Sequence, residues 1–134
     1  MSGKDISVLC VDDNADMVFM LSTLVDAEPD MRSVGTLASA DELVAVAEQL
    51  KPRVIVLDLT MPGKPPLQAM EELWVAAPGS RVIVLSGYDD AGTENEVMSA
   101  GAWALISKSR DINEVINAIR RVASKEEGRD AKDC

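Results

Sequence analysis

The sequence predicts an α/β domain in which five helices cover both faces of a five-stranded, mostly parallel sheet, a doubly wound arrangement. The first observation is that short β-branched runs alternate with longer segments whose apolar residues recur at helical spacing. The second is that two runs, RVIVLD at residues 53–58 and RVIVLS at residues 81–86, are near copies ending in a polar residue. The third is a length of 134 residues, which suits one domain with a substantial core. Such alternation favours parallel strands and right-handed crossovers.

The first third of the chain contains two strand and helix pairs. Residues 6–11 form an apolar strand, and the following helix ends at Pro29, because proline cannot continue it. A weaker strand over residues 32–35 leads to a second helix, which Ser39 or Asp41 could cap. The apolar positions of the first helix are Met17, Val18, Leu21, Leu24 and Val25.

Three further pairs follow after Pro52. The strands are expected at residues 53–58, 81–86 and 103–107, and the helices at residues 67–76, 91–100 and 112–123. Pro78-Gly79 marks a turn and Gly101 stops the fourth helix. The domain should therefore cover residues 1–124, and the polar segment 125–134 is either a frayed end or the start of a linker.

Composition excludes several classes of protein. A net charge of −10 works against direct nucleic-acid binding. No apolar run approaches the roughly 18 residues of a membrane span, and we expect a cytoplasmic protein without membrane contact. Cys10, inside a strand, and Cys134 are expected to be free thiols. The absence of histidine removes Ser-His-Asp catalysis and histidine-ligated zinc, so any chemistry must use carboxylates, hydroxyls and amines.

Polar side chains stand at the carboxyl ends of four predicted strands. They are Asp12, Asp13, Asp58, Ser86 and Lys108. Ligand sites of open α/β sheets form at this edge, where strand order reverses. Strand order 3-2-1-4-5 would leave Asp58 remote from the first strand, whereas the flavodoxin-like order 2-1-3-4-5 brings all three carboxylates together.

Three clustered carboxylates need a cation. Two unit charges about 5 Å apart repel by roughly 3 kcal/mol at an effective dielectric of 20. Mg²⁺ prefers oxygen ligands and would relieve this repulsion, and Lys108 adds a further positive charge. Each side chain also has an ordinary structural explanation: Asp12, Asp13 or Asn14 could cap the first helix, Asp58 could begin a turn, Ser86 could cap a helix, and Lys108 could be a solvated loop charge.

Four motifs resemble the receiver domain of bacterial two-component response regulators. They are VDDN at residues 11–14, VLDLTMPG at residues 56–63, VLSGY at residues 84–88 and GAWALISKS at residues 101–109. The resemblance implies that Asp58 accepts a phosphoryl group from a partner's phosphohistidine. It also implies that Asp13, Asp58 and the backbone carbonyl of Thr60 coordinate Mg²⁺, with Asp12 acting through a bound water.

The resemblance assigns further roles around the acceptor. Lys108 would pair with the carboxylate or the phosphoryl oxygens, and Ser86 would donate a hydrogen bond to the phosphoryl group. Thr60 and Tyr88, two residues beyond Asp58 and Ser86, would influence the lifetime of the phosphorylated state, with Tyr88 limiting access of water.

The sequence departs from the family pattern at three places. Leu105 stands where a switch aromatic is usual, which puts the usual coupling in doubt. By strand alternation Trp103 should share its face, and it either packs beneath one of the last two helices or joins an apolar contact patch. Ser109 replaces the usual proline, and the prolines of residues 64–66 should stiffen the entrance beside Asp58.

The predicted function is a phosphorylation-activated switch that alters the face formed by residues 91–100, 103–107 and 112–123. Its chemistry would be limited to self-phosphotransfer and autodephosphorylation. Implied partners are a sensor histidine kinase or phosphotransfer protein, a DNA-binding output domain if the chain is a fragment, and a second copy in a homodimer. The alternatives are a degenerate receiver that acts only by binding and a Mg²⁺-dependent phosphatase, whose family typically needs an aspartate where Thr60 stands.

Overall fold

A computed structural model describes residues 6–59, 63–87, 91–108 and 111–124, which form a five-stranded parallel sheet in the order β2-β1-β3-β4-β5. The strands are β1 (Ile6–Val11), β2 (Met31–Leu37), β3 (Val54–Asp58), β4 (Arg81–Ser86) and β5 (Ala104–Ser107). The helices are α1 (Ala15–Ala27), α2 (Leu43–Leu50), α3 (Pro66–Ala76), α4 (Ala91–Ser99) and α5 (Ile112–Ser124). The predicted fold class and strand order are confirmed. Residues 125–134 lie outside the described residues.

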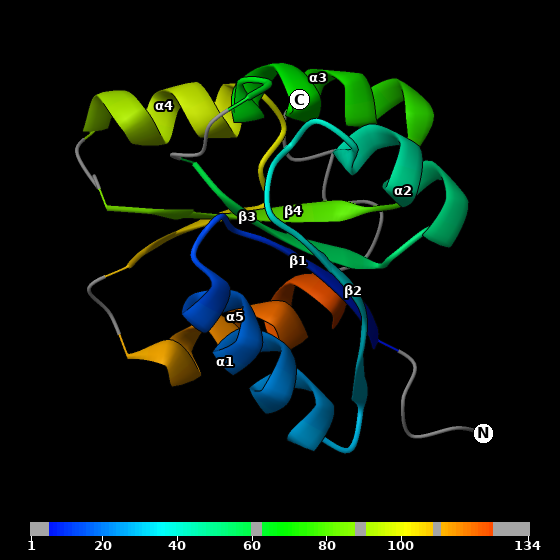
Figure 1. Ribbon diagram of the computed structural model, residues 1–134. Coiled ribbons are helices and arrows are strands. Elements are labelled where there is room, and N and C mark those ends of the chain that lie inside the picture. The colour runs from blue at the N-terminus through cyan, green and yellow to red at the C-terminus, as the bar shows by residue number, and fades with distance from the viewer. Residues whose placement is uncertain (1–5, 60–62, 88–90, 109–110, 125–134) are drawn as a thin grey trace.

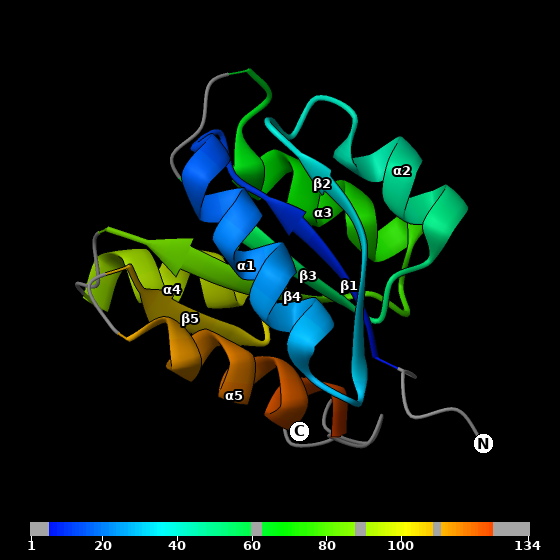
Figure 2. The same cartoon turned by 60° about the horizontal axis from the view of Figure 1, so that its bottom comes forward.

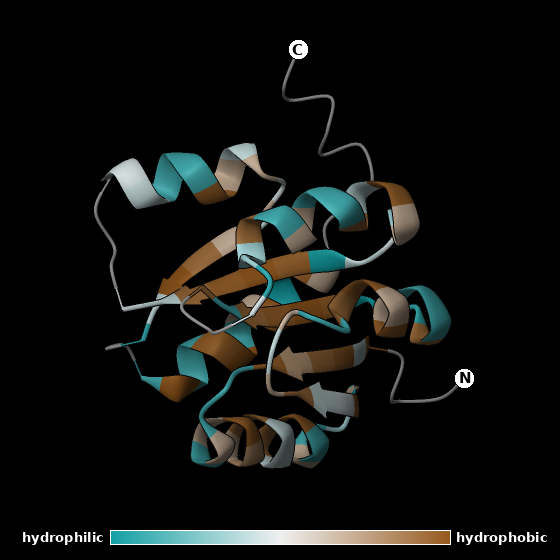
Figure 3. Cartoon of the chain, turned by 45° about the horizontal axis from the view of Figure 1, so that its top comes forward, coloured by the Kyte–Doolittle hydropathy of each residue, from teal (hydrophilic) through white to brown (hydrophobic). Residues whose placement is uncertain are grey.

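The sheet separates two helical layers, each with its own apolar core. Helices α1 and α5 cover one face, and α2, α3 and α4 cover the other (Figures 1 and 2). Strand β1 contributes alternate side chains to the two cores. Val8 and Cys10 belong to the core beside α1 and α5, and Leu9 and Val11 belong to the opposite core. Because successive side chains point to opposite faces, a strand buried on both sides must be apolar throughout. The strands β1, β3 and β4 are accordingly mostly hydrophobic, and most of the sheet is brown in Figure 3.

The expected common face of Trp103 and Leu105 is wrong. Trp103 packs against the core beside α1 and α5, as do Ala104 and Ile106, whereas Leu105 packs against the opposite core. Strand β5 begins at Ala104, so the alternation that orients Leu105 does not extend back to Trp103. The tryptophan therefore packs on the α5 side of the sheet.

Helices α1 and α2 differ in whether a side chain caps their first turn. Asn14 caps α1, its side chain accepting a hydrogen bond from Met17 N at 3.1 Å, so neither Asp12 nor Asp13 does. For α2 the expected caps are wrong: the cap position is Glu42, without a side-chain cap hydrogen bond. Asp41 instead binds a distant loop, described below.

Two arginines at the amino ends of the central strands bind the last turn of α5. Arg53 Nη2 donates to Ala123 O, and Arg81 Nη1 donates to Val122 O, each at 2.7 Å. The last carbonyls of a helix have no partner within it and carry the negative end of its dipole. The two guanidinium groups supply both a donor and a compensating charge.

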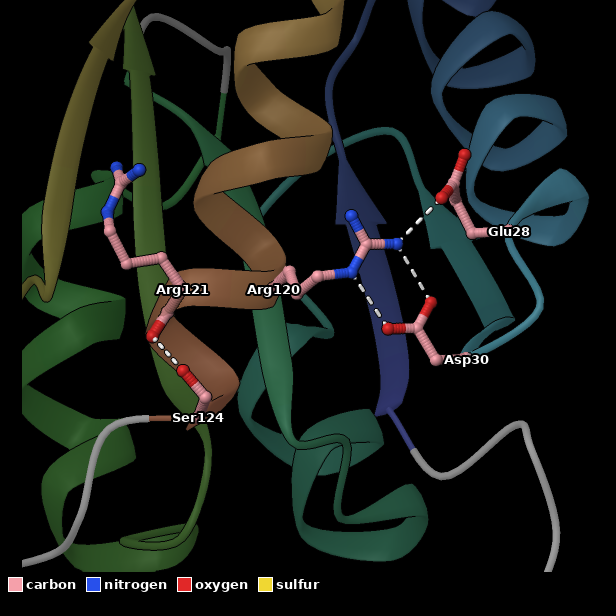
Figure 4. Close-up of polar contacts among 5 residues, drawn as sticks. All are labelled: Glu28, Asp30, Arg120, Arg121 and Ser124. Atoms are coloured by element: carbon pink, nitrogen blue, oxygen red, sulfur yellow. Dashed lines mark hydrogen bonds and ion pairs between the residues drawn. The ribbon is translucent and has the colours of Figure 1, made fainter.

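A third arginine joins α5 to the segment between α1 and β2. Arg120 Nε and Nη2 bind both oxygens of Asp30 at 2.8 and 2.9 Å, and Nη2 also binds Glu28 at 2.6 Å (Figure 4). The neighbouring Arg121 side chain points away from this group in the same view. Within the described ranges, no helix is both long and apolar enough to cross a membrane.

Candidate functional site

The polar residues singled out in the sequence converge at the carboxyl edge of the sheet. Asp12 and Asp13 follow β1, Asp58 ends β3, Ser86 ends β4 and Lys108 follows β5. Strand β3 pairs with both β1 and β4, and β4 pairs with β5, so the four strand ends lie beside one another. The prediction that strand order brings the three carboxylates together is confirmed.

Backbone hydrogen bonds continue the sheet ladder past the strand ends and fix the site. Asp12 N donates to Leu37 O at 3.0 Å, and Lys108 N donates to Ser86 O at 2.8 Å. Between β3 and β4, Leu59 N donates to Leu85 O at 2.9 Å. The backbone that carries the acidic and basic side chains is therefore as constrained as the sheet itself.

Lys108 bridges two buried carboxylates. Its Nζ lies 3.1 Å from Asp58 Oδ1 and 3.3 Å from Asp12 Oδ2, and both aspartate side chains are only 1% exposed. Partial burial acts to lower the pKa of Lys108, but the hydrogen bonds and charges of Asp58 and Asp12 outweigh it, and the pKa lies above its ordinary value. The lysine is therefore an ammonium at neutral pH and not a solvated loop charge.

The acidic residues fit a divalent cation. One carboxylate oxygen from each of Asp12, Asp13 and Asp58 lies within 4.8 Å of the others. Two oxygens on opposite sides of an octahedral Mg²⁺ would be about 4.2 Å apart, so small side-chain adjustments would suffice. Three carboxylates and the Lys108 ammonium leave two negative charges, which one Mg²⁺ would balance. The donor set thus fits the ion that the sequence suggested.

The adjacent aspartates have different surroundings. Asp12 is buried, its Oδ1 accepts a hydrogen bond from Asn14 N at 2.9 Å, and its Oδ2 faces Lys108. Asp13 is exposed beside it. The two carboxylates are therefore not equivalent, and Asp13 is the one open to solvent.

Of the remaining predicted site residues, the structure describes Ser86 and Leu105. Ser86 is fully buried at the end of β4, one position beyond Leu85, the register partner of Asp58. Thr60 and Tyr88 lie outside the described residues, as does Ser109, so their roles stay predictions. Leu105 is partly buried against the core beside α2, α3 and α4.

Sequence reasoning missed one contact of the site region. Asp41 Oδ1 accepts a hydrogen bond from Lys64 N at 2.8 Å, across 23 positions of sequence. From the sequence, Asp41 is only a candidate helix cap, and no local pattern reveals a hydrogen-bond partner 23 positions away. Lys64 lies in the connection between β3 and α3, six positions after Asp58.

Comparisons with known proteins agree with this geometry. Residues 8–120 match the family model of the response regulator receiver domain. The transcriptional regulatory protein LiaR of Bacillus subtilis is 32% identical over 122 residues, which are 91% of this chain and 57% of the relative. A protein-glutamate methylesterase/protein-glutamine glutaminase of Thermotoga maritima is 36% identical over 110 residues, 81% of this chain and 32% of the relative.

Solved structures show the same fold. The response regulator domain of Thermotoga maritima CheB has a TM-score of 0.82 at 31% identity, covering 90% of this chain and 98% of that domain. The signal receiver domain of the putative response regulator NarL from Mycobacterium tuberculosis has a TM-score of 0.85 at 19% identity, covering 92% and 99%. The chain spans little more than half the length of LiaR and about a third of the methylesterase. On the family match and these identities, the chain belongs to the response regulator receiver domains of two-component systems.

Proposed function

We propose that the chain is a phosphorylation-activated switch in which Asp58 accepts a phosphoryl group from a partner in a Mg²⁺-dependent reaction. The observation that carries the proposal is the position of Asp58. Its carboxylate is buried and within 3.1 Å of the Lys108 ammonium, and it shares the sheet edge with two further carboxylates. Burial and fixed charges hold one oxygen ready for attack at a site suited to phosphoryl transfer.

In the proposed reaction, an oxygen of Asp58 forms a bond to phosphorus as the phosphorus–nitrogen bond of the donor's phosphohistidine breaks. The nitrogen keeps the bonding electron pair. The ring leaves as neutral imidazole when its other nitrogen carries a proton, and otherwise the leaving nitrogen takes a proton from water. Lys108 stays positively charged and shifts from the carboxylate toward the phosphoryl oxygens. Ser86 donates its hydroxyl proton in a hydrogen bond to another of these oxygens.

Asp13, Asp58 and the Thr60 carbonyl would hold Mg²⁺, and Asp12 would act through a water. The exposure of Asp13 and the existing contacts of Asp12 with Asn14 N and Lys108 support this division. When bound, the ion would neutralise charge that develops on the equatorial phosphoryl oxygens. Tyr88 would limit access of water to the product, and Thr60 would contribute to the lifetime of the phosphorylated state.

Phosphorylation would add roughly −1.5 to −2 of charge at the sheet edge, in the manner of other phosphorylated side chains. Lys108 immediately follows β5, so a change in its contacts would act on the face of α4, β5 and α5, where Leu105 lies. The donor would be a sensor histidine kinase or phosphotransfer protein. Since LiaR is a transcriptional regulator, a DNA-binding output domain is one output that a longer version of this chain could control.

The test uses acetyl phosphate with and without Mg²⁺, followed by intact-mass spectrometry. We expect one phosphoryl adduct that survives acid, is lost in base, forms only with Mg²⁺ and is absent in Asp58→Asn. Asp16→Asn is the matched control, because it removes an exposed carboxylate in the first turn of α1 and should leave the adduct intact. A folded wild-type protein that forms no adduct would instead favour a module that acts by binding alone.

A further inference from the structure

Helices α3 and α4 lie on the same face of the sheet (Figure 1), and an open groove of about 420 Å³ lies between them. This volume is within the range of ligand pockets in proteins. The lining residues are Leu67 and Glu71 of α3, Asn95, Glu96 and Ser99 of α4, and Ala100. The acidic site at the strand ends uses none of these residues, so the groove is a separate feature of the surface.

The groove continues past Ala100 toward an exposed apolar surface on α3. Ala100 also lines a smaller cavity of about 80 Å³, whose wall includes Trp74. The Trp74 side chain is 50% exposed, and a Cβ added to Gly101 would clash with its indole, so the ring rests directly on the backbone that follows α4. Val75, the next residue, is 86% exposed. Two neighbouring apolar side chains are thus open to solvent at the end of the groove.

Helix α4 has few side chains that anchor it to the sheet. Among its described side chains only Val97 is buried, whereas α3 buries four residues. The three residues that α4 contributes to the groove are all exposed. The wall of the groove on this side is therefore polar and accessible to a second molecule.

The two helices carry only negative charge. Residues 66–76 and 91–99 contain four glutamates and neither lysine nor arginine. Lys64 Nζ lies 2.6 Å from Glu72 Oε1 and balances that charge. Glu71 and Glu96 both line the groove, and among the described residues neither has an ion-pair partner. Two carboxylates in one groove favour a cationic occupant.

We propose that the groove between α3 and α4 binds a basic amphipathic helix of a partner protein. Trp74 and Val75 follow Glu71 by three and four positions, so the apolar and acidic side chains lie one helical turn apart. A partner helix presents apolar and basic side chains at the same spacing, with its lysines or arginines beside Glu71 and Glu96. The net charge of −10 would also speed the encounter with a cationic partner. Binding in this groove requires neither Mg²⁺ nor a phosphoryl group, so the inference goes beyond the proposed function.

The test titrates the nitrogen-15-labelled protein, without Mg²⁺, with a capped peptide of about 14 residues, roughly four helical turns. Its leucines and lysines are ordered as an amphipathic helix. We expect saturable shifts of the Trp74 indole N–H resonance and of the backbone amides of residues 67–77 and 95–101. A peptide of the same composition in scrambled order should bind about tenfold more weakly, because it keeps the charge but loses the apolar stripe.

The matched variants remove two charges each. Glu71→Gln/Glu96→Gln should weaken binding of the ordered peptide about tenfold, since two exposed ion pairs are lost. Glu42→Gln/Glu48→Gln removes the same charge from exposed positions at α2 and should bind like the wild type. All four glutamates are exposed, so the three proteins should unfold at the same temperature.

Three results would overturn the proposal. One is the absence of saturable shifts, or shifts confined to the acidic edge or to the exposed side of α5. Another is an equal loss of affinity in the two double variants, because net charge and not the groove would then attract the peptide. The third is equal binding of the ordered and scrambled peptides, which would rule out a helical occupant. None of these measurements depends on whether Asp58 accepts a phosphoryl group.

Discussion

Arg81 lies with its guanidinium carbon 4.2 Å from the centre of the Trp103 ring. The same guanidinium donates a hydrogen bond to Val122 O in the last turn of α5. One side chain thus joins the start of β4, the residue before β5 and the end of α5. These elements form one edge of the molecule, opposite the edge that carries the acidic residues.

We predict that Arg81→Met lowers the free energy of unfolding by about 2 kcal/mol, because it removes a cation–π contact and a charged hydrogen bond. Methionine preserves much of the apolar stem, so the loss reports on the guanidinium. Urea unfolding measures it. Arg32→Met is the control, since Arg32 is exposed on the edge strand β2 and should lose less than about 0.5 kcal/mol. Equal losses in the two variants would contradict the role given to Arg81.

Arg120→Ala should destabilise the domain by about 1 kcal/mol and not more, because the side chain is 41% exposed and water screens its ion pairs. The pKa of Arg120 is raised by its hydrogen bonds to Asp30 and Glu28, which shows that the paired, charged form is favoured. The difference from wild type, measured by thermal unfolding, should shrink in 1 M NaCl.

Arg121→Ala provides the comparison for this variant. Arg121 is adjacent and has the same charge, but its side chain points away from the carboxylates in Figure 4. It should have a smaller effect with weaker salt dependence. If the loss of stability in Arg120→Ala did not depend on salt, Arg120 would contribute through packing and not through its ion pairs.

Cys10 should be almost inert toward thiol reagents. Burial, assisted by the charges of Asp26 and Asp12, raises the pKa of its thiol to about 12. At pH 8 the thiolate would then be roughly a thousandfold rarer than for a free cysteine. Labelling of a Cys134→Ser variant with a maleimide should therefore be very slow in the native protein and rapid in denaturant. Fast labelling of the native variant would show that β1 opens readily.

Mg²⁺ at ten times its Kd should raise the free energy of unfolding of the wild type by about 1.4 kcal/mol. Asp13→Asn should abolish this gain, because it removes the solvent-facing carboxylate of the cluster. Without Mg²⁺, the same variant should be more stable than wild type by about 1 kcal/mol, since it relieves repulsion that water only partly screens. Urea unfolding in Mg²⁺ or EDTA tests both statements, and Glu48→Gln, which removes an exposed charge on α2, should change neither.

The sequence predicted the fold well because its signals are local and mutually consistent. Strands β1, β3 and β4 are short apolar runs, and the expected β1 and β4 have the bounds that the structure shows. Strand order was inferred from chemistry: only the order that joins β1 to β3 brings Asp12 and Asp13 to Asp58, and the structure has that order. The central site was therefore predictable from residue types at strand ends.

The errors arose where tertiary contacts override a local pattern. Trp103 lies before β5, so its orientation is set by the packing of that segment and not by the alternation of side chains within the strand. Asp41 satisfies a loop N–H and leaves α2 without a side-chain cap. Arg53 contacts Ala123 of α5 across 70 positions, and Arg120 of α5 contacts Asp30 across 90 positions. A single sequence carries no signal that pairs residues so far apart.

The two tryptophans of the chain lie beside the start of β4, whereas the acidic cluster lies at the carboxyl ends of the strands. Both line a cavity of about 80 Å³ beside the start of β4, and a Cβ on Gly101 would clash with the Trp74 indole. Trp103 stands five residues before Lys108, or about 16 Å along an extended strand. We therefore expect tryptophan emission to change little when Mg²⁺ binds at the acidic edge, and to change when a rearrangement reaches the start of β4. If Asp58 is phosphorylated as proposed, tryptophan emission would thus report a rearrangement at the amino edge of the sheet and not the phosphorylation itself.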